Sequence, residues 1–151
     1  MLHTIKVYQV TFTNNTGTHT INYTREKDAR SFCEYYSDAS MIETTMEVKV
    51  TEQMKKEYQR LFKEIREKDF GVDSKRVDNC KFPKPMMTAT QMDKGTATVN
   101  CGGEWLTVDA TKRIADKVMA NESFKAFITK YEAKAELELT PFHSYQIRIT
   151  F

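Results

Sequence analysis

Apolar and polar residues follow a strand pattern at the start of the chain. β-branched and aromatic residues are concentrated in 5–12, and the same composition resumes in 19–23. The residues between them, 14–17, are Asn-Asn-Thr-Gly, and both Asn and Gly tolerate the positive φ angles of tight turns. The sequence therefore predicts a β-hairpin over residues 5–23.

The hairpin is followed by the pattern of a helix and then by that of a strand. Thr24 is expected to cap the helix, because its hydroxyl can accept a hydrogen bond from a free backbone N–H. The apolar positions of this helix have the spacing of a single stripe: Ala29, Phe32, Cys33 and Tyr36. From 41 to 51 the residues alternate, and one side of the strand carries Ile42, Met46, Val48 and Val50. We expect that side to be covered and the opposite side to face water.

The clearest helical pattern begins after Thr51, which we expect to cap the helix. Its apolar stripe is formed by Met54, Tyr58, Leu61, Phe62 and Ile65. Charged residues on the other side are spaced for i,i+4 ion pairs, as in Glu52 and Lys56. Gly71 should end the helix, because glycine readily adopts the left-handed conformation that often follows a helix terminus.

Residues 72–96 differ from the sequence on either side. They contain two of the three prolines, Pro83 and Pro85, and they show no sustained apolar period. An irregular stretch of this length inside a compact domain is generally either functional or disordered. We therefore predict an irregular connection that carries a function.

Strand and helix patterns return after this segment. Two short strands, 97–101 and 104–108, surround Gly102-Gly103 and predict a second hairpin. Asp109 is expected to cap the helix that follows, and Asn121 to cap the next one.

Two further strands, 136–140 and 145–151, are predicted at the end of the printed sequence. Residues 5–50 then have the order ββαβ, and residues 97–140 have the order ββααβ. The predicted fold class is α+β, a mostly antiparallel sheet with helices packed on one face and two ββαβ-like halves. A duplication and the chance use of a common arrangement both account for such halves.

Length and composition fit one globular domain. The chain has 151 residues, the usual size of a domain, and its 40% hydrophobic content is sufficient for a core. We predict a single domain over residues 1–151, with subunits 1–71 and 97–151 joined by the irregular segment 72–96.

Other features of the composition bear on where the protein acts. The three cysteines are far apart in the sequence, which predicts reduced thiols rather than disulfides or a zinc knuckle. The chain starts without the apolar region of a signal peptide, and no run approaches the roughly 20 apolar residues of a membrane span. We expect a cytoplasmic protein without membrane contact.

Catalytic and metal-binding patterns are absent from the sequence. His3, His19 and His143 are not spaced as zinc ligands, and none begins the His-x-Ser/Thr motif of two-histidine phosphoesterases. The five glycines form no nucleotide-binding loop. Cys101 is the best-placed thiol, but a nucleophile also needs a lowered pKa. We therefore expect no enzyme activity, no cofactor and no metal site.

A binding surface is predicted in and beside the irregular segment. Around Pro83 and Pro85 the backbone is already extended, so ordering it on binding costs little conformational entropy. An aromatic ring, adaptable thioethers and cations share this stretch. The predicted binding residues are Arg76, Lys81, Phe82, Lys84, Met86, Met87 and, beyond the segment, Trp105. In the alternative interpretation, Phe82 and Met86 pack onto the protein's own core.

The first functional hypothesis is a non-catalytic binding protein that acts stoichiometrically on a protein partner. A short Met- and Tyr-rich chain without catalytic motifs resembles the accessory and inhibitor proteins of bacteriophages and mobile elements, which implies an inhibitor of a host defence complex. The alternative is a nucleic-acid or nucleotide-ligand binding module that stacks bases on Tyr8, Phe82 or Trp105. A third option is an enzyme assembled across a homodimer, with strand 145–151 pairing across a two-fold axis.

Overall fold

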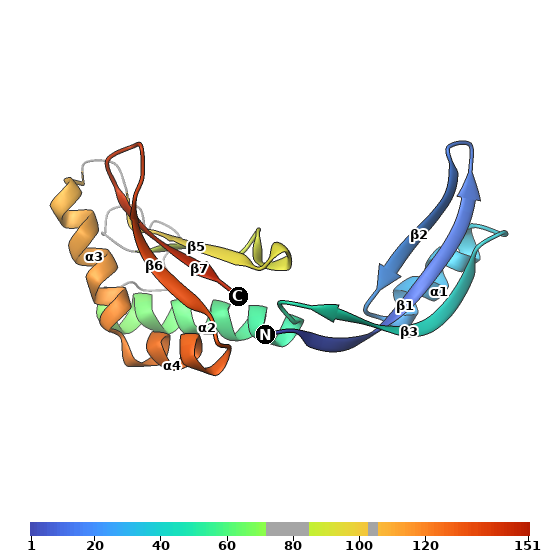
Figure 1. The fold of residues 1–151 in the computed structure, drawn as a ribbon, viewed down its shortest axis with the longest axis horizontal. Coiled ribbons are helices and arrows are strands. Elements are labelled where there is room, and N and C mark those ends of the chain that lie inside the picture. The colour runs from blue at the N-terminus through green and yellow to red at the C-terminus, as the bar shows by residue number, and fades with distance from the viewer. Residues whose placement is uncertain (72–84, 103–105) are drawn as a thin grey trace. The chain divides into compact units, whose positions relative to one another are not determined.

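The structure is a computed structural model, and it describes residues 1–71, 85–102 and 106–151. It has an α+β fold with two antiparallel sheets and four α-helices in these residues. The chain divides into two compact units, Leu2–Val48 and Lys49–Phe151, which Figure 1 shows in blue to teal and in green to red. The prediction of a single domain stays a prediction.

The N-terminal unit consists of a three-stranded sheet and one helix. Its elements are β1 (His3–Asn14), β2 (Gly17–Tyr23), α1 (Glu26–Tyr35) and β3 (Ser40–Val48), and the strand order is β2-β1-β3. The predicted hairpin is confirmed, because β1 pairs antiparallel with β2 as far as the Asn14–Gly17 pair beside the turn. The predicted cap of α1 is wrong. Arg25 occupies that position and makes no capping hydrogen bond through its side chain.

Helix α1 covers only one face of this sheet. The Phe12 ring lies 4.9 Å from the Phe32 ring and 5.5 Å from the Tyr36 ring, measured between centroids. Residues directly paired across strands point to the same face, and Phe12, Val10 and Met41 therefore share the covered face. Ile42 and Met46 point to the other face.

The C-terminal unit combines three helices with a four-stranded sheet. Its elements are α2 (Glu52–Asp69), β4 (Met86–Thr88), the 3₁₀ helix η1 (Met92–Lys94), β5 (Thr96–Asn100), α3 (Val108–Ala120), α4 (Glu122–Lys130), β6 (Lys134–Leu139) and β7 (Tyr145–Thr150). The strand order is β4-β5-β7-β6, and all pairs are antiparallel. Helices α2 and α4 run along one side of these strands in Figure 1.

The core of this unit lies between the helices and the sheet. The apolar stripe predicted for α2 is buried, and Tyr58 and Phe62 contact each other edge to face at 4.9 Å. Ile147 and Ile149 of β7 are fully buried in the same cluster. Thr51 caps α2 as predicted, with its side chain accepting a hydrogen bond from Met54 N at 3.3 Å.

Several predictions for the C-terminal half are wrong. Leu106 and Thr107 are not in a strand, and Val108 begins α3, so the strand predicted over 104–108 is not found in its described residues. Thr107 rather than Asp109 caps α3, because its side chain accepts from Ala110 N at 3.2 Å. Asn121 caps α4 as predicted.

The strand predicted over 145–151 is confirmed as β7, but it is not an edge strand. It pairs with β5 on one side and with β6 on the other, so it has no free backbone edge for pairing with a strand of a second subunit. The edge on this side of the sheet is β6. None of the helices that the structure describes is long and apolar enough to cross a lipid bilayer.

Candidate binding site

The predicted binding residues fall into two groups. Arg76, Lys81, Phe82, Lys84 and Trp105 lie outside the described residues. Met86 and Met87 are on β4, where their side chains point to opposite faces of the sheet. Met86 is 47% exposed, whereas Met87 packs partly buried against the core. Of the predicted residues that the structure describes, only Met86 is therefore largely free to contact a partner.

Residues 85–96 belong to the frame of the C-terminal unit rather than to an irregular connection. Pro85 is buried, and its carbonyl oxygen accepts a hydrogen bond from Arg66 Nε on α2 at 2.9 Å. Met92 is fully buried in the core, and Asp93 forms a 2.5 Å ion pair with Lys55 of α2. The described part of the predicted irregular segment, 85–96, is therefore folded against the core, and sequence periodicity missed this because β4 and η1 have three residues each.

An exposed apolar surface is found instead on the N-terminal unit. Ile42 is 57% exposed and Met46 is 37% exposed, on the face of the sheet that α1 leaves open. The alternating sequence placed both residues on one side of the strand correctly. The prediction that this side is covered is wrong for Ile42 and Met46, whereas Val48 is partly buried and Val50 is buried. Val7 of the same face is buried, so the exposed apolar area lies mainly along β3. β3 is also an edge strand.

Carboxylates accompany this surface. Glu43 and Glu47 lie on β3 and point to the opposite face from Ile42, and the strand contains no basic residue. Glu43 forms an exposed 3.0 Å ion pair with Lys6 of the neighbouring β1. On α1, Tyr35 adds a ring that is 82% exposed. Tyr35, Ile42 and Met46 are therefore large apolar side chains of one small unit that remain in contact with solvent. We call Ile42, Met46 and the outer edge of β3 the β3 surface.

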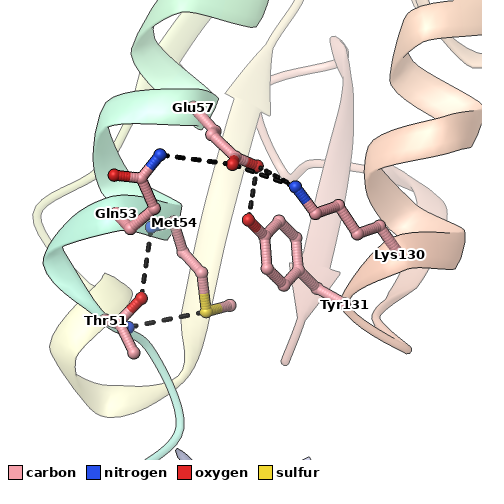
Figure 2. Close-up of polar contacts among 6 residues, drawn as sticks. All are labelled: Thr51, Gln53, Met54, Glu57, Lys130 and Tyr131. Atoms are coloured by element: carbon pink, nitrogen blue, oxygen red, sulfur yellow. Dashed lines mark hydrogen bonds and ion pairs between the residues drawn. The ribbon is translucent and has the colours of Figure 1, made fainter. Parts of the chain in front are cut away.

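A hollow lies between α2 and α4 of the C-terminal unit. It has a volume of ≈ 260 Å³, and its lining residues are Glu57, Arg60, Leu61, Glu64, Ser123, Ala126, Phe127 and Lys130. Figure 2 shows the polar contacts of Glu57, one of these lining residues. The Glu57 carboxylate accepts hydrogen bonds from Tyr131 Oη, from Lys130 Nζ at 3.0 Å and from Gln53 Nε2 at 3.4 Å.

This network fixes the charge of Glu57. The hydrogen bond from Tyr131 is the main reason that the pKa of Glu57 lies below its usual value, with Lys130 acting in the same direction. A carboxylate with a lowered pKa is a weaker base than usual, whereas acid–base catalysis near neutral pH needs a raised one. Glu57 therefore has a structural role: its hydrogen bonds join α2 to the end of α4.

Replacing Tyr131 by Phe is expected to raise the pKa of Glu57 towards its usual value, because the largest cause of the shift is removed. A lowered carboxylate pKa stabilises the fold above the unfolded pKa, and this contribution is lost as the pH falls through the folded pKa. The variant should therefore lose less stability than the wild type between neutral and acidic pH. NMR titration of the Glu57 carboxyl carbon measures the shift. Gln53→Ala is the control with a smaller effect, and an unchanged Glu57 pKa in Tyr131→Phe would contradict the assignment.

Cys101 does not have the environment of a nucleophile. Its side chain is completely buried, and burial raises the pKa of the thiol to about 12. The reactive form is the thiolate, so at neutral pH almost all of this side chain is in the unreactive form. Cys33, by contrast, is partly buried and lines a hollow of ≈ 320 Å³ beside Arg30 and Met41.

Thiol labelling should therefore distinguish the two cysteines. In a Cys80→Ser variant, a disulfide reagent at pH 8 is expected to modify Cys33 in the native protein and Cys101 only after unfolding. The measurement is the release of thiolate chromophore before and after addition of guanidinium chloride, with the modified peptide identified by mass spectrometry. Rapid native labelling of Cys101 would show that its side chain is accessible.

The histidines and carboxylates do not assemble a metal site in the part of the chain that the structure describes. No group of three or more His, Cys, Asp and Glu side chains there could hold an ion. His19 instead stabilises the first hairpin, since its Nε2 lies 2.7 Å from Thr16 Oγ1 and 2.9 Å from Asn14 Oδ1.

Comparison with known proteins adds no functional assignment. No protein-family model, no curated protein and no solved structure matches this chain.

Proposed function

We propose that the chain is a non-catalytic binding protein that acts stoichiometrically on a protein partner, and that the partner binds at the β3 surface. The observation that carries this proposal is the exposure of Ile42 and Met46 on an edge strand whose apolar face is left open by α1. Apolar side chains grouped on an exposed surface are typical of protein interaction sites. Exposed edge strands also accept strands from other proteins, which gain backbone hydrogen bonds and insert alternate side chains.

The charges of β3 favour a protein partner over a nucleic acid. Glu43 and Glu47 are the only charged residues of the strand. Glu43 is paired with Lys6, but Glu47 would repel a phosphate at this edge, and the strand itself offers the phosphate no cation. A basic or neutral strand would be accepted, because opposite charges across neighbouring strands are stabilising. The alternative function, a nucleic-acid or nucleotide-ligand binding module, depends on Arg76, Lys81, Lys84 and Trp105, which lie outside the described residues.

Among binding proteins without catalytic activity, a stoichiometric inhibitor needs the fewest features. Blocking a partner requires an interface but no nucleophile or metal. The resemblance of the sequence to accessory proteins of bacteriophages and mobile elements supports a host defence complex as the target. Binding through the predicted residues between Arg76 and Met87 stays a prediction, and it is best tested by substituting Phe82 and Lys84, since a deletion that reaches Met92 would remove a core side chain.

The test is a photo-crosslinking amino acid placed at position 42 in the full chain and exposed to a bacterial lysate. A specific protein adduct is expected, and the affinity for that protein should fall about tenfold or more in an Ile42→Ser/Met46→Ser variant, because interface side chains that matter each contribute more than about 1 kcal/mol. Leu2→Ser is the matched control, since Leu2 is 59% exposed in the same unit but lies outside β3. Full affinity in the double variant would overturn the proposal.

Titration with labelled oligonucleotides separates the two functional classes. At two salt concentrations, a protein-binding module should show no measurable binding, whereas a nucleic-acid binder would show an affinity that falls steeply with salt.

A further inference from the structure

β6 presents an unpaired backbone edge on the C-terminal unit. It is the last strand of the β4-β5-β7-β6 sheet, and among the described residues only β7 pairs with it. The amide of Thr140 donates to the carbonyl oxygen of Ser144 at 2.8 Å, which fixes the hydrogen-bonding phase of the two strands. Hydrogen-bonded and non-hydrogen-bonded residue pairs alternate along an antiparallel ladder. The backbone groups of Glu136 and Glu138 therefore bond to β7, whereas Ala135, Leu137 and Leu139 direct their N–H and C=O groups outwards.

The side chains of β6 are divided between two faces. Leu137 and Leu139 point to the same face as the buried Ile147, but they are 37% and 55% exposed. Lys134, Glu136 and Glu138 point to the open face, and Lys134 forms a 2.7 Å ion pair with Glu136. β6 therefore combines a free backbone, exposed leucines and charges of both signs.

We infer that β6 is the interface for a second copy of this chain, paired antiparallel about a two-fold axis at Glu136. Outward-facing residues must pair with outward-facing residues, which limits the registers. With the axis at Glu136, Lys134 of each copy faces Glu138 of the other, and Ala135 of each copy faces Leu137 of the other. Opposite charges then meet on the open face, and a small side chain meets a large one on the other face.

The neighbouring registers are less favourable. An axis at Ala135 also places Lys134 opposite Glu136 twice, but it pairs only residues 134–136 of the strand, whereas the axis at Glu136 pairs residues 134–138. An axis at Leu137 places Glu136 opposite Glu138 of the second copy, and it does so twice. An axis at Glu138 places that residue opposite its own copy and leaves Lys134 without a facing carboxylate. The chosen register also has one like pair, Glu136 with itself, but each Glu136 already has its own Lys134 beside it.

The same reasoning distinguishes β6 from the other unit's edge. β3 contains Glu43 and Glu47 and no basic residue, so self-pairing there could bring no opposite charges together. β6 carries Lys134 and Glu138 at equal distances on either side of Glu136, so two antiparallel copies place opposite charges across from each other. The dimer rests on a six-residue strand, and we expect a reversible association that depends on protein concentration.

Charge reversal tests the register directly. Sedimentation velocity over a range of concentrations should show a monomer–dimer equilibrium for the wild-type chain. Lys134→Glu and Glu138→Lys should each weaken dimerisation about tenfold, because two opposite-charge pairs become like-charge pairs in each case. The double variant Lys134→Glu/Glu138→Lys should bind more tightly than either single variant, because the cross-strand pairs are again of opposite charge, although it lacks the Lys134–Glu136 ion pair of the wild type. Lys112→Glu, an exposed charge reversal on α3, is the matched control and should change nothing.

A second measurement locates the axis independently. A Glu136→Cys variant should form a disulfide between two copies under mild oxidation, because residue 136 faces itself, and Glu132→Cys should not. Circular dichroism checks that each variant is folded. A chain that stays monomeric at all concentrations, a dimer that single charge reversals do not weaken, or a double variant that binds no more tightly than the single variants would each overturn the inference.

Discussion

Met92→Ala is expected to lower the free energy of unfolding by about 2–5 kcal/mol, the usual cost of truncating a large buried side chain. Met92 has no exposed surface and belongs to the core between the helices and the sheet. Its 3₁₀ helix is also held at its end, where the N–H of Gly95, at φ 89°, donates to the carbonyl oxygen of Met92 at 2.8 Å. A side chain in this position cannot be removed without leaving a cavity.

Urea denaturation followed by circular dichroism measures this effect. Met86→Ala is the matched control, because Met86 is 47% exposed on β4, only six residues away, and its truncation should change stability by no more than about 0.5 kcal/mol. Equal effects of the two variants would show that residues 85–96 are not part of the folded frame.

Thr111→Val is expected to cost about 1–3 kcal/mol, although the two side chains have nearly the same shape. Thr111 is 1% exposed, and its hydroxyl donates to Val108 O at 2.7 Å and accepts from Tyr145 N at 3.0 Å. The second bond joins α3 to the first residue of β7. Valine would leave the partly buried Tyr145 N–H without this partner, and a donor withdrawn from water loses hydration without compensation.

A second threonine provides the control for this prediction. Thr98→Val changes the same group on the open face of β5, where the side chain is partly exposed, and its effect should stay within about 0.5 kcal/mol. Chemical denaturation of both variants gives the difference. If Thr111→Val proved as stable as the wild type, the hydrogen bond to Tyr145 would contribute nothing to the docking of α3 on β7.

The candidate site was only partly accessible from the sequence. The alternation around Ile42 and Met46 placed both side chains on one side of the strand, but it could not show whether a helix would cover that side. The covering helix is positioned by ring contacts between Phe12 and Phe32, residues 20 positions apart in the chain. Sequence analysis assumed that the more apolar side would be buried, whereas the aromatic cluster of the hairpin holds α1 on the opposite face.

The interaction surface at β6 was missed for a related reason. The sequence predicted both C-terminal strands, and it proposed 145–151 as the edge for pairing. Their order in the sheet is set by β5, which pairs with β7 and makes it an interior strand. No local pattern in the sequence records which of two neighbouring strands a distant third strand will join.

By itself, the amino-acid sequence determined the elements whose evidence is local. The first hairpin follows from two strand patterns on either side of a short turn, and the Thr51 cap of α2 and the Asn121 cap of α4 are hydrogen bonds that span three residues. Tertiary structure alone decided the rest: the face that α1 covers, the inclusion of Met92 in the core and the exposed edge at β6. These features depend on contacts between segments far apart in the chain, and their energies appear only when the segments are brought together.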